Sequence, residues 1–157
     1  MKQSQQEYYD SLPKIPMGSN VIFFNENREL LLVKPNYKSY WLLPGGSADA
    51  NESPRQTAIR ETKEEIGLNI DAMQLLVVDY FTPPEGNNLK FMFYGGTLSV
   101  EQVASIVLQE EELDEFVFVP IEKALEMLGE SMKKRIPHCL EALRNNDALY
   151  LENGEKI

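Results

Sequence analysis

Apolar runs bounded by polar turns recur along the chain, and they predict a domain rich in β-structure. Residues 21–24 (VIFF) and 30–33 (LLLV) flank the polar turn 25–27, which is typical of a hairpin of two buried strands. Residues 73–81 and 89–98 are also β-rich and flank a turn of Pro, Gly and Asn at 83–88, which predicts a second hairpin. A further strand is predicted at 116–119, where the run FVFV ends at Pro120.

Residues 53–66 follow a helical period instead. Ala58, Thr62 and Ile66 recur every four residues, with Ile59 beside them, so they lie on one face of a helix that can pack on a core. The end signals are also present: the N-cap Ser53, Pro54 at the first position, Gln56 completing a capping box, and the terminating Gly67. The sequence therefore predicts a helix with well-defined ends.

Shorter helical patterns follow later in the chain. Residues 99–108 predict a short helix, residues 121–128 predict a second, and Pro137 is expected to begin a third that runs through residue 144. The tail 148–157 contains a turn at 152–154, so it predicts either a small hairpin or a segment that docks on a partner subunit. Strands around one helix, with more helix near the C-terminus, predict an α+β fold with the layers of an α/β/α sandwich.

Length and composition fit one domain over residues 1–157, because 157 residues that are 43% hydrophobic can bury a proper core. No stretch approaches the roughly 18 apolar residues that cross a bilayer, and the N-terminal residues lack the apolar run of a secretory signal. The lone Cys139 excludes an internal disulfide and fits a reducing compartment. We therefore expect a cytoplasmic protein with no membrane partner.

The formal net charge of −10 argues against a surface that grips polymeric nucleic acid, since such surfaces are basic. Small phosphorylated substrates remain open, because metal ions can bridge carboxylates to phosphate oxygens. A small-molecule partner is therefore expected.

Three carboxylates crowd the predicted helix 53–66. Glu61, Glu64 and Glu65 are spaced i, i+3 and i+4, so their side chains converge on one stripe. Like charges this close repel, and a hard divalent cation with oxygen ligands, Mg²⁺ above all, would turn the repulsion into coordination. Arg60 lies four residues before Glu64 and can hold that carboxylate in place.

The stretch 46–68 resembles the signature of the Nudix hydrolases, G-x5-E-x7-R-E-U-x-E-E-x-G-U, in which U is a bulky aliphatic residue. Leu68 fills the last U, and every fixed position matches, through Gly46, Glu52, Arg60, Glu61, Glu64, Glu65 and Gly67. Thr62 departs at the first U position, which weakens packing more than chemistry. The preceding run 41–46 (WLLPGG) commonly precedes this box in the family and reads as a short buried strand ending in a Gly-rich turn. The alternative, an ordinary solvated acidic helix, requires no such fixed offsets.

The resemblance implies a mixed sheet packed between helices and a Mg²⁺-dependent pyrophosphohydrolase, with Mn²⁺ as an alternative metal. It implies that Glu61, Glu64 and Glu65 bind the metal, with help from the backbone carbonyl of Gly45 or Gly46. Family members frequently add one acid from a later loop. Any of the three glutamates at 110–112 can take this role, and we take the central Glu111 as the candidate.

The catalytic candidates carried over from the resemblance are Glu61, Glu64 and Arg60. The general base is Glu61 or an acid of the 110–112 loop, Arg60 orients the acids, and Glu52 supports the loop geometry or an outer water. The implied reaction is hydrolysis of the pyrophosphate bond of a nucleoside diphosphate linked to another group, in a nucleoside triphosphate, ADP-ribose or a sugar nucleotide.

Other positions carry weaker signals. Prolines 83 and 84 fall where family members that cleave ADP-ribose often carry one, although an ordinary turn is the stronger explanation. The loop 34–40, with two lysines and two tyrosines, is either a substrate contact or a solvated loop. His138 reads as a surface or capping residue, and residues 133–135 (KKR) as a solvated patch. Family members often dimerise, so a homodimer stays open.

Two other classes of function compete with the enzyme. A nucleotide-sensing module on the same fold would bind a ligand without consuming it, but the intact set of box acids argues against this. A dimer whose acids bind Ca²⁺ structurally is weaker, because the spacing lacks an EF-hand loop.

Overall fold

Strand β1 (Met17–Asn25) forms the centre of the sheet in the computed structural model, which describes residues 3–157. Its apolar run is buried on both faces, and Val21, Ile22 and Phe23 are completely inaccessible. On one side β1 pairs in parallel with β5 (Asn88–Leu98), and on the other it pairs antiparallel with β2 (Leu30–Pro35) and β3 (Gly45–Ser47). A run buried on both faces is what such a central position requires.

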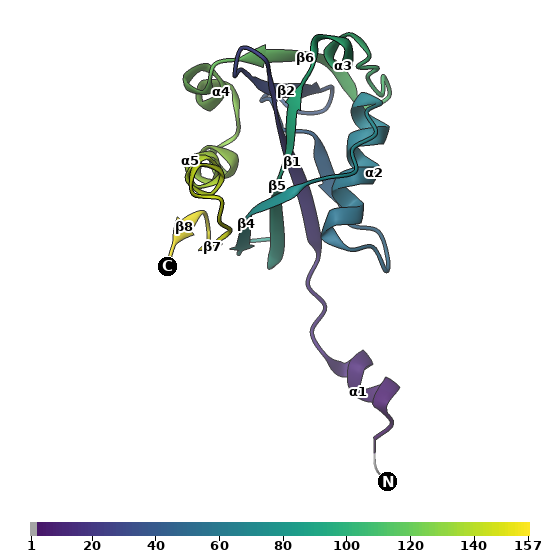
Figure 1. The fold of residues 1–157 in the computed structure, drawn as a ribbon. Coiled ribbons are helices and arrows are strands. Elements are labelled where there is room, and N and C mark those ends of the chain that lie inside the picture. The colour runs from purple at the N-terminus through teal and green to yellow at the C-terminus, as the bar shows by residue number, and fades with distance from the viewer. Residues whose placement is uncertain (1–2) are drawn as a thin grey trace.

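The sheet is mixed and has eight strands, in the order β6-β2-β1-β5-β4-β7-β8 with β3 beside β1 (Figure 1). The remaining strands are β4 (Gln74–Phe81), β6 (Leu113–Val119), β7 (Leu149–Glu152) and β8 (Glu155–Lys156). The two predicted hairpins are confirmed as β1–β2 and β4–β5, and the tail folds back as the hairpin β7–β8. The predicted α+β fold is confirmed, with helices on both faces of the sheet (Figure 1).

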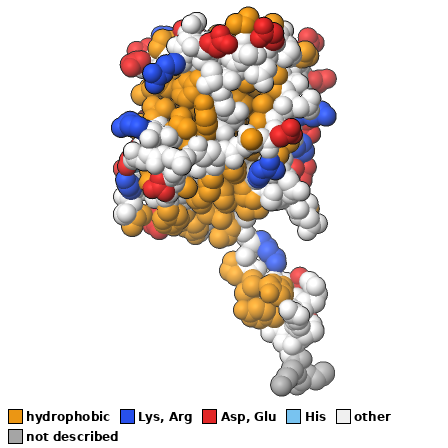
Figure 2. Space-filling view, viewed as in Figure 1, with side chains coloured by type: hydrophobic (Ala, Val, Ile, Leu, Met, Phe, Trp, Pro, Cys, Tyr) orange, Lys and Arg blue, Asp and Glu red, His pale blue; other side chains and the backbone are white. Residues whose placement is uncertain are grey.

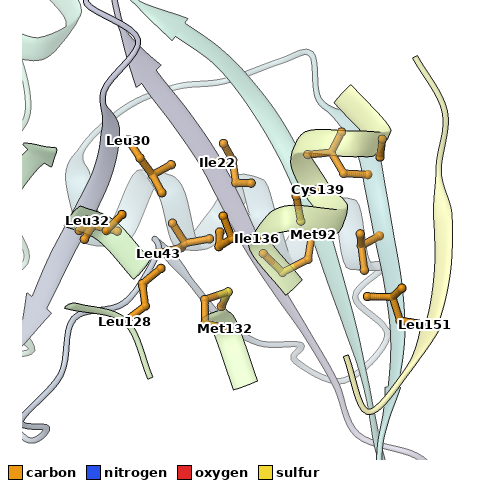
Figure 3. Close-up of a cluster of buried hydrophobic side chains, with 14 residues drawn as sticks. Ile22, Leu30, Leu32, Leu43, Met92, Leu128, Met132, Ile136, Cys139 and Leu151 are labelled. Atoms are coloured by element: carbon orange, nitrogen blue, oxygen red, sulfur yellow. The ribbon is translucent and has the colours of Figure 1, made fainter. Parts of the chain in front are cut away.

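Helix α2 (Pro54–Ile66) covers one face, while α4 (Ile121–Met127) and α5 (Glu130–Asn145) cover the other (Figure 1). Neighbouring residues of β1 therefore enter different cores: Phe23 packs with Ala58 of α2, and Ile22 packs with Ile136 of α5. Figure 3 shows the second core, in which Ile22 and Leu43 lie near Met132 and Ile136. This alternation is the period of two expected for a strand between two layers.

The ends of α2 agree with the sequence. Ser53 caps the helix, its hydroxyl accepting from the Gln56 N–H while the Gln56 side chain accepts from the Ser53 N–H. Gly67 ends the helix at φ 73°, a left-handed conformation that favours glycine. Glu65 is also buried on this helix, beside Ile66, although it belongs to the acidic stripe.

Three predicted boundaries are wrong. Helix α5 begins at Glu130 rather than Pro137, which lies inside it, because Met132 and Ile136 are needed to cover the sheet. The short helix α3 spans only Val100–Ala104. The strand before the box is the glycine segment itself, β3, which pairs with β1, whereas the apolar run 41–43 makes only isolated bridges, Leu42 to Val33 and Trp41 to Leu128.

The short helix α1 (Gln5–Ser11) was not anticipated from the sequence. Ser4 caps it with a complete capping box, but none of its residues is buried. It lies apart from the body of the molecule (Figure 1), and Figure 2 shows hydrophobic side chains gathered on this segment, where Tyr8, Tyr9, Leu12 and Ile15 are exposed. Among residues 3–157, no helix has the length and apolar character needed to span a membrane.

The basic run 133–135 is not a solvated patch throughout. Lys133 and Lys134 are partly exposed, but Arg135 is only 3% exposed and its Nε donates to Asp79 Oδ2 at 2.6 Å. The correction follows from helical geometry, because Arg135 lies beside Ile136 on the face of α5 that packs on the sheet.

Candidate active site

Strand β3 passes directly over the acidic stripe of α2. A Cβ atom at Gly46 would lie 2.4 Å from Glu61 Oε1, so only glycine permits this approach. Gly45 has φ 147° and its N–H donates to Glu65 Oε2 at 2.7 Å. The two glycines therefore place the backbone of β3 against the carboxylates of the helix.

Arg60 connects the loop before α2 to the helix through hydrogen bonds to both, and we call this set of contacts the Arg60 hub. Its Nε and Nη2 donate to the two oxygens of Glu52 at 2.8 and 2.9 Å, and Nη2 also donates to the Ser47 carbonyl at 3.0 Å. Its Nη1 donates to Glu61 Oε1 at 2.9 Å and Glu64 Oε2 at 3.0 Å. The Arg60 guanidinium lowers the pKa of Glu52 to about 2, so Glu52 serves as the permanent counter-charge of the hub.

Glu65 is the most buried acid of the box, at 6% exposure. Burial raises the pKa of Glu65 to about 8, although the Gly45 N–H opposes this, and the negative charges of Glu61, Glu112 and Glu64 raise it further. Burial also raises the pKa of Glu61, against the opposing charge of Arg60. Ionising these carboxylates in the metal-free protein is therefore costly, because burial and their mutual repulsion outweigh the compensation from Arg60 and the Gly45 N–H.

Glu112 is the acid of the later loop whose charge bears most on the box. Its charge raises the pKa of both Glu61 and Glu65. Backbone hydrogen bonds hold this loop against the end of α2, including Gln109 N–H to the Glu65 carbonyl at 3.0 Å. The role of the 110–112 loop stays a prediction, and within that loop these charges favour Glu112 over Glu111.

The donor set fits a hard divalent cation, because buried carboxylate oxygens that repel one another are relieved by bound positive charge. Within residues 3–157, no three His, Cys, Asp or Glu side chains are gathered as a finished metal site. Arg60 lies between Glu61 and Glu64, and Glu65 is engaged by the Gly45 N–H. The Glu64 side chain is 48% exposed, which leaves it free to turn from Arg60 toward a cation.

A hollow of about 720 Å³ adjoins the box at Gly45 and Gly46. Three parts of the chain form its other walls: the loop carrying Tyr37, Lys38 and Tyr40, strand β5 at Lys90, and the start of α5 through Arg135. The prediction that the loop 34–40 touches substrate stays a prediction. Three residues of this loop line the hollow, where a bound substrate could contact them. Lys34 is occupied instead with the carbonyl oxygens of Pro35 and Lys38.

The weaker candidates lie outside this hollow. Pro83 lines a neighbouring hollow of about 570 Å³ that shares Ser47 and Lys90 with it. His138 faces Glu141, with 3.8 Å between Nδ1 and the carboxylate, and contributes to neither the box nor the hollow.

Sequence reasoning missed two cationic residues that line the hollow, Lys90 of β5 and Arg135 of α5. The signal for Lys90 was available, because a lysine interrupts the otherwise apolar strand 89–94. The signal for Arg135 was hidden in a run of three basic residues, where the helical face could be assigned only once the start of α5 was known.

Comparison with known proteins gives concordant matches. The family model described as the NUDIX domain matches residues 14–139. A Nudix hydrolase of Pseudomonas aeruginosa is 33% identical over 147 residues, covering 88% of this chain and 79% of that protein. Against several other curated relatives, the match spans only about half of their length.

Two solved structures show the same fold. The MutT protein from Methanosarcina mazei Go1 superposes with a TM-score of 0.68 at 26% identity, covering 87% of this chain and 99% of that one. The NUDIX domain of Shewanella oneidensis NrtR complexed with ADP ribose superposes with a TM-score of 0.69 at 19% identity, covering 90% of this chain and 99% of that one.

Proposed function

The chain belongs to the Nudix hydrolase family, and from this premise we propose that it hydrolyses the pyrophosphate bond of a nucleoside diphosphate linked to another group, with Mg²⁺ as its metal. Nudix hydrolases use divalent metal ions. The observation that carries the proposal is the cluster of Glu61 and Glu65, buried against Gly45 and Gly46 at the edge of a 720 Å³ hollow. The proposal treats residues 1–157 as a single Nudix domain.

The metal-binding residues in this proposal are Glu61, Glu64 and Glu65, with the Gly45 or Gly46 carbonyl and Glu112 in place of Glu111. A bound Mg²⁺ would neutralise the charge of the pyrophosphate and lower the pKa of a bound water. All other tasks fall to the chain, which must position the acids and accept the proton of the attacking water.

Glu61 is our candidate for the general base, with Glu112 as the alternative. Burial raises the pKa of Glu61, which brings a carboxylate closer to the pH at which it can accept a proton effectively. Arg60 is a positioning residue, because it fixes Glu61 and Glu64 and is itself fixed by Glu52.

The substrate class remains within three chemistries: nucleoside triphosphates, ADP-ribose and sugar nucleotides. The bound ADP ribose of the NrtR domain supports including ADP-ribose, and Tyr37 and Tyr40 offer aromatic rings beside the hollow for a base or sugar. The bound ligand is expected to be a small nucleotide.

The test is product analysis with purified protein, Mg²⁺ and these three substrate classes, alongside Glu65→Gln. We expect Glu65→Gln to lower kcat by roughly 10²- to 10⁴-fold without lowering the melting temperature, and chelation of Mg²⁺ to abolish turnover. Glu111→Gln is the matched control, since it removes the same charge from the neighbouring loop and should stay within about twofold of wild type.

Near-native turnover by Glu65→Gln would overturn the proposed roles of the box acids. Binding without turnover across all three classes would overturn the hydrolase and favour a nucleotide-binding module.

A further inference from the structure

Three cationic side chains and one acidic one line the hollow beside the box, and the acid, Glu130, is paired with Lys133 outside it. Lys38, Lys90 and Arg135 all line it, although the chain as a whole carries a net charge of −10. Neither Lys90 nor Arg135 forms an ion pair with a box acid among residues 3–157. These cations therefore stand apart from the network that Arg60 organises.

Arg135 is held rigidly but is not fully satisfied. Its Nε donates to Asp79 Oδ2 at 2.6 Å, and its guanidinium lies over the Phe81 ring, 4.9 Å from the centroid. The second Asp79 oxygen is already taken by the Gly154 N–H at 3.0 Å. Arg135 Nη2 is buried and has no hydrogen-bond partner in the described part of the chain. A buried donor without an acceptor is costly, and a ligand that supplies an acceptor to Arg135 Nη2 would remove that cost.

Lys90 lies beside it on the same face of the sheet. Lys90 in β5 is directly paired with Asp79 in β4, yet the structure of residues 3–157 gives its ammonium no hydrogen bond or ion pair. Burial and the charges of Arg135 and Lys38 all lower the pKa of Lys90, and no carboxylate offsets them. A bound anion would relieve this uncompensated charge.

The ammonium also lies close to the box. A Cβ atom built at Gly18 would be 3.2 Å from both Lys90 Nζ and the Gly46 carbonyl oxygen, so these two atoms share one small region. A substrate whose pyrophosphate rests at the acids of α2 would therefore place its adjoining group beside Lys90.

We propose that Lys90 and Arg135 form a subsite for a second anionic group of the substrate, a phosphate or carboxylate carried outside the scissile pyrophosphate. This inference rests on the proposed function and narrows it. The preferred substrates would be nucleoside diphosphates linked to a group that is itself charged, such as the terminal phosphate of a nucleoside triphosphate or an acidic sugar. Guanidinium and ammonium groups together suit either anion.

The experiment compares ligand pairs that differ by one anionic group: UDP-glucuronate with UDP-glucose, and ATP with ADP. Dissociation constants are measured by calorimetry with Ca²⁺ in place of Mg²⁺, and kcat/KM is measured separately with Mg²⁺. We expect the wild-type protein to prefer the more anionic member of a pair by about tenfold or more, as a charge-assisted hydrogen bond warrants. The two pairs distinguish a phosphate from a carboxylate.

Lys90→Gln should remove this preference, with the loss of affinity and of kcat/KM falling mainly on the more anionic member of each pair. Lys90→Arg should restore it, and Lys123→Gln, which removes an exposed lysine of α4, should leave it intact. The melting temperature of Lys90→Gln should equal or exceed that of wild type, because a desolvated and unpaired cation is removed.

Equal losses on both members of each pair would overturn the subsite, since Lys90 would then serve the scissile pyrophosphate itself. Turnover with no preference in either pair would also overturn it while leaving the hydrolase standing. A preference in binding that Lys90→Gln removes, without turnover of any ligand, would support the subsite and overturn the hydrolase.

Discussion

At the scale of single residues, Glu65 combines two opposing properties: it is an ionisable carboxylate and it is buried. The same helical face that buries Ile66 also buries Glu65, and among the described residues the Gly45 N–H is the one hydrogen-bond donor to its carboxylate. A charged carboxylate in that position is costly without a cation, which is why its protonation is coupled to both stability and metal binding.

The metal-free protein should lose stability as pH rises because of Glu65. Its pKa is about 8 in the folded state, against a usual value of 4.5 in the unfolded chain. Below pH 4.5 both states are protonated, between 4.5 and 8 only the folded state holds the proton, and above 8 the full cost applies. In EDTA, the melting temperature of Glu65→Gln should exceed that of wild type at pH 8.5, and the gap should close toward pH 5.

Melting curves across this pH range provide the check, and addition of Mg²⁺ should narrow the gap at pH 8.5. A constant difference between the two proteins at all pH values would contradict the assigned cause.

Cys139 should be chemically silent in the folded protein. It lies on the inner face of α5 and is completely buried in the core, and burial raises the pKa of its thiol to about 12. Because the thiolate is the reactive species, Ellman's reagent should modify it only after unfolding in denaturant. Rapid stoichiometric reaction in native buffer would show that α5 opens far more readily than its packing indicates.

The residue scale also shows where sequence reasoning succeeds. Glu52, Arg60 and Gly46 can be recognised from the sequence alone, because their spacing matches the box signature. Arg135 does not, because its burial and its bond to Asp79 depend on the register of α5 against a strand far away in the chain. Spacing reveals local geometry, whereas the opposite wall of the hollow is made by tertiary contacts.

At the scale of elements, the caps of α2 and α1 form a natural comparison. Ser53→Ala removes one capping bond from a helix packed on the core and should cost about 1 kcal/mol of unfolding free energy. Ser4→Ala removes the same kind of cap from α1, which buries no residue, and should leave that free energy unchanged. Chemical denaturation of both variants checks this, and equal losses would show that α1 docks on the body or on a second copy.

The same contrast explains which elements were predictable. Helix α2 is predictable from its capping residues and from apolar positions that recur every four residues. The hairpins β1–β2 and β4–β5 are predictable from the polar turns between their apolar runs. The predicted start of α5 is too late, because proline favours the first turn of a helix, whereas Pro137 lies inside this one. Strand β3 consists of glycines and serine, which have low strand propensity, and only its pairing with β1 makes it a strand.

At the scale of the whole molecule, the Asp79–Arg135 pair joins three parts of the fold. Asp79 belongs to β4, Arg135 to α5, and Gly154 to the turn of the hairpin β7–β8. Asp79→Ala should cost about 3–5 kcal/mol of unfolding free energy, because it leaves a guanidinium buried without its counter-charge.

Glu126→Ala is the matched control for this pair. It breaks the exposed Lys123–Glu126 ion pair, whose atoms lie 2.9 Å apart, and should cost no more than about 1 kcal/mol. Denaturant titration of both variants measures the difference. Similar costs would mean that water reaches Arg135 when Asp79 is removed.

The order of the strands has a further consequence, for the rate at which the chain folds. The central pairing joins Met17 to Leu89 and Asn25 to Leu98. Strand β1 therefore pairs with β5 only after a long intervening segment of the chain has brought β5 to it. Closing such a loop costs entropy before any contact repays it, which slows folding relative to a helical bundle. Until β5 arrives, the run Val21, Ile22, Phe23 and Phe24 has an open edge on which another unfolded chain can dock, and refolding yield should therefore fall as protein concentration rises.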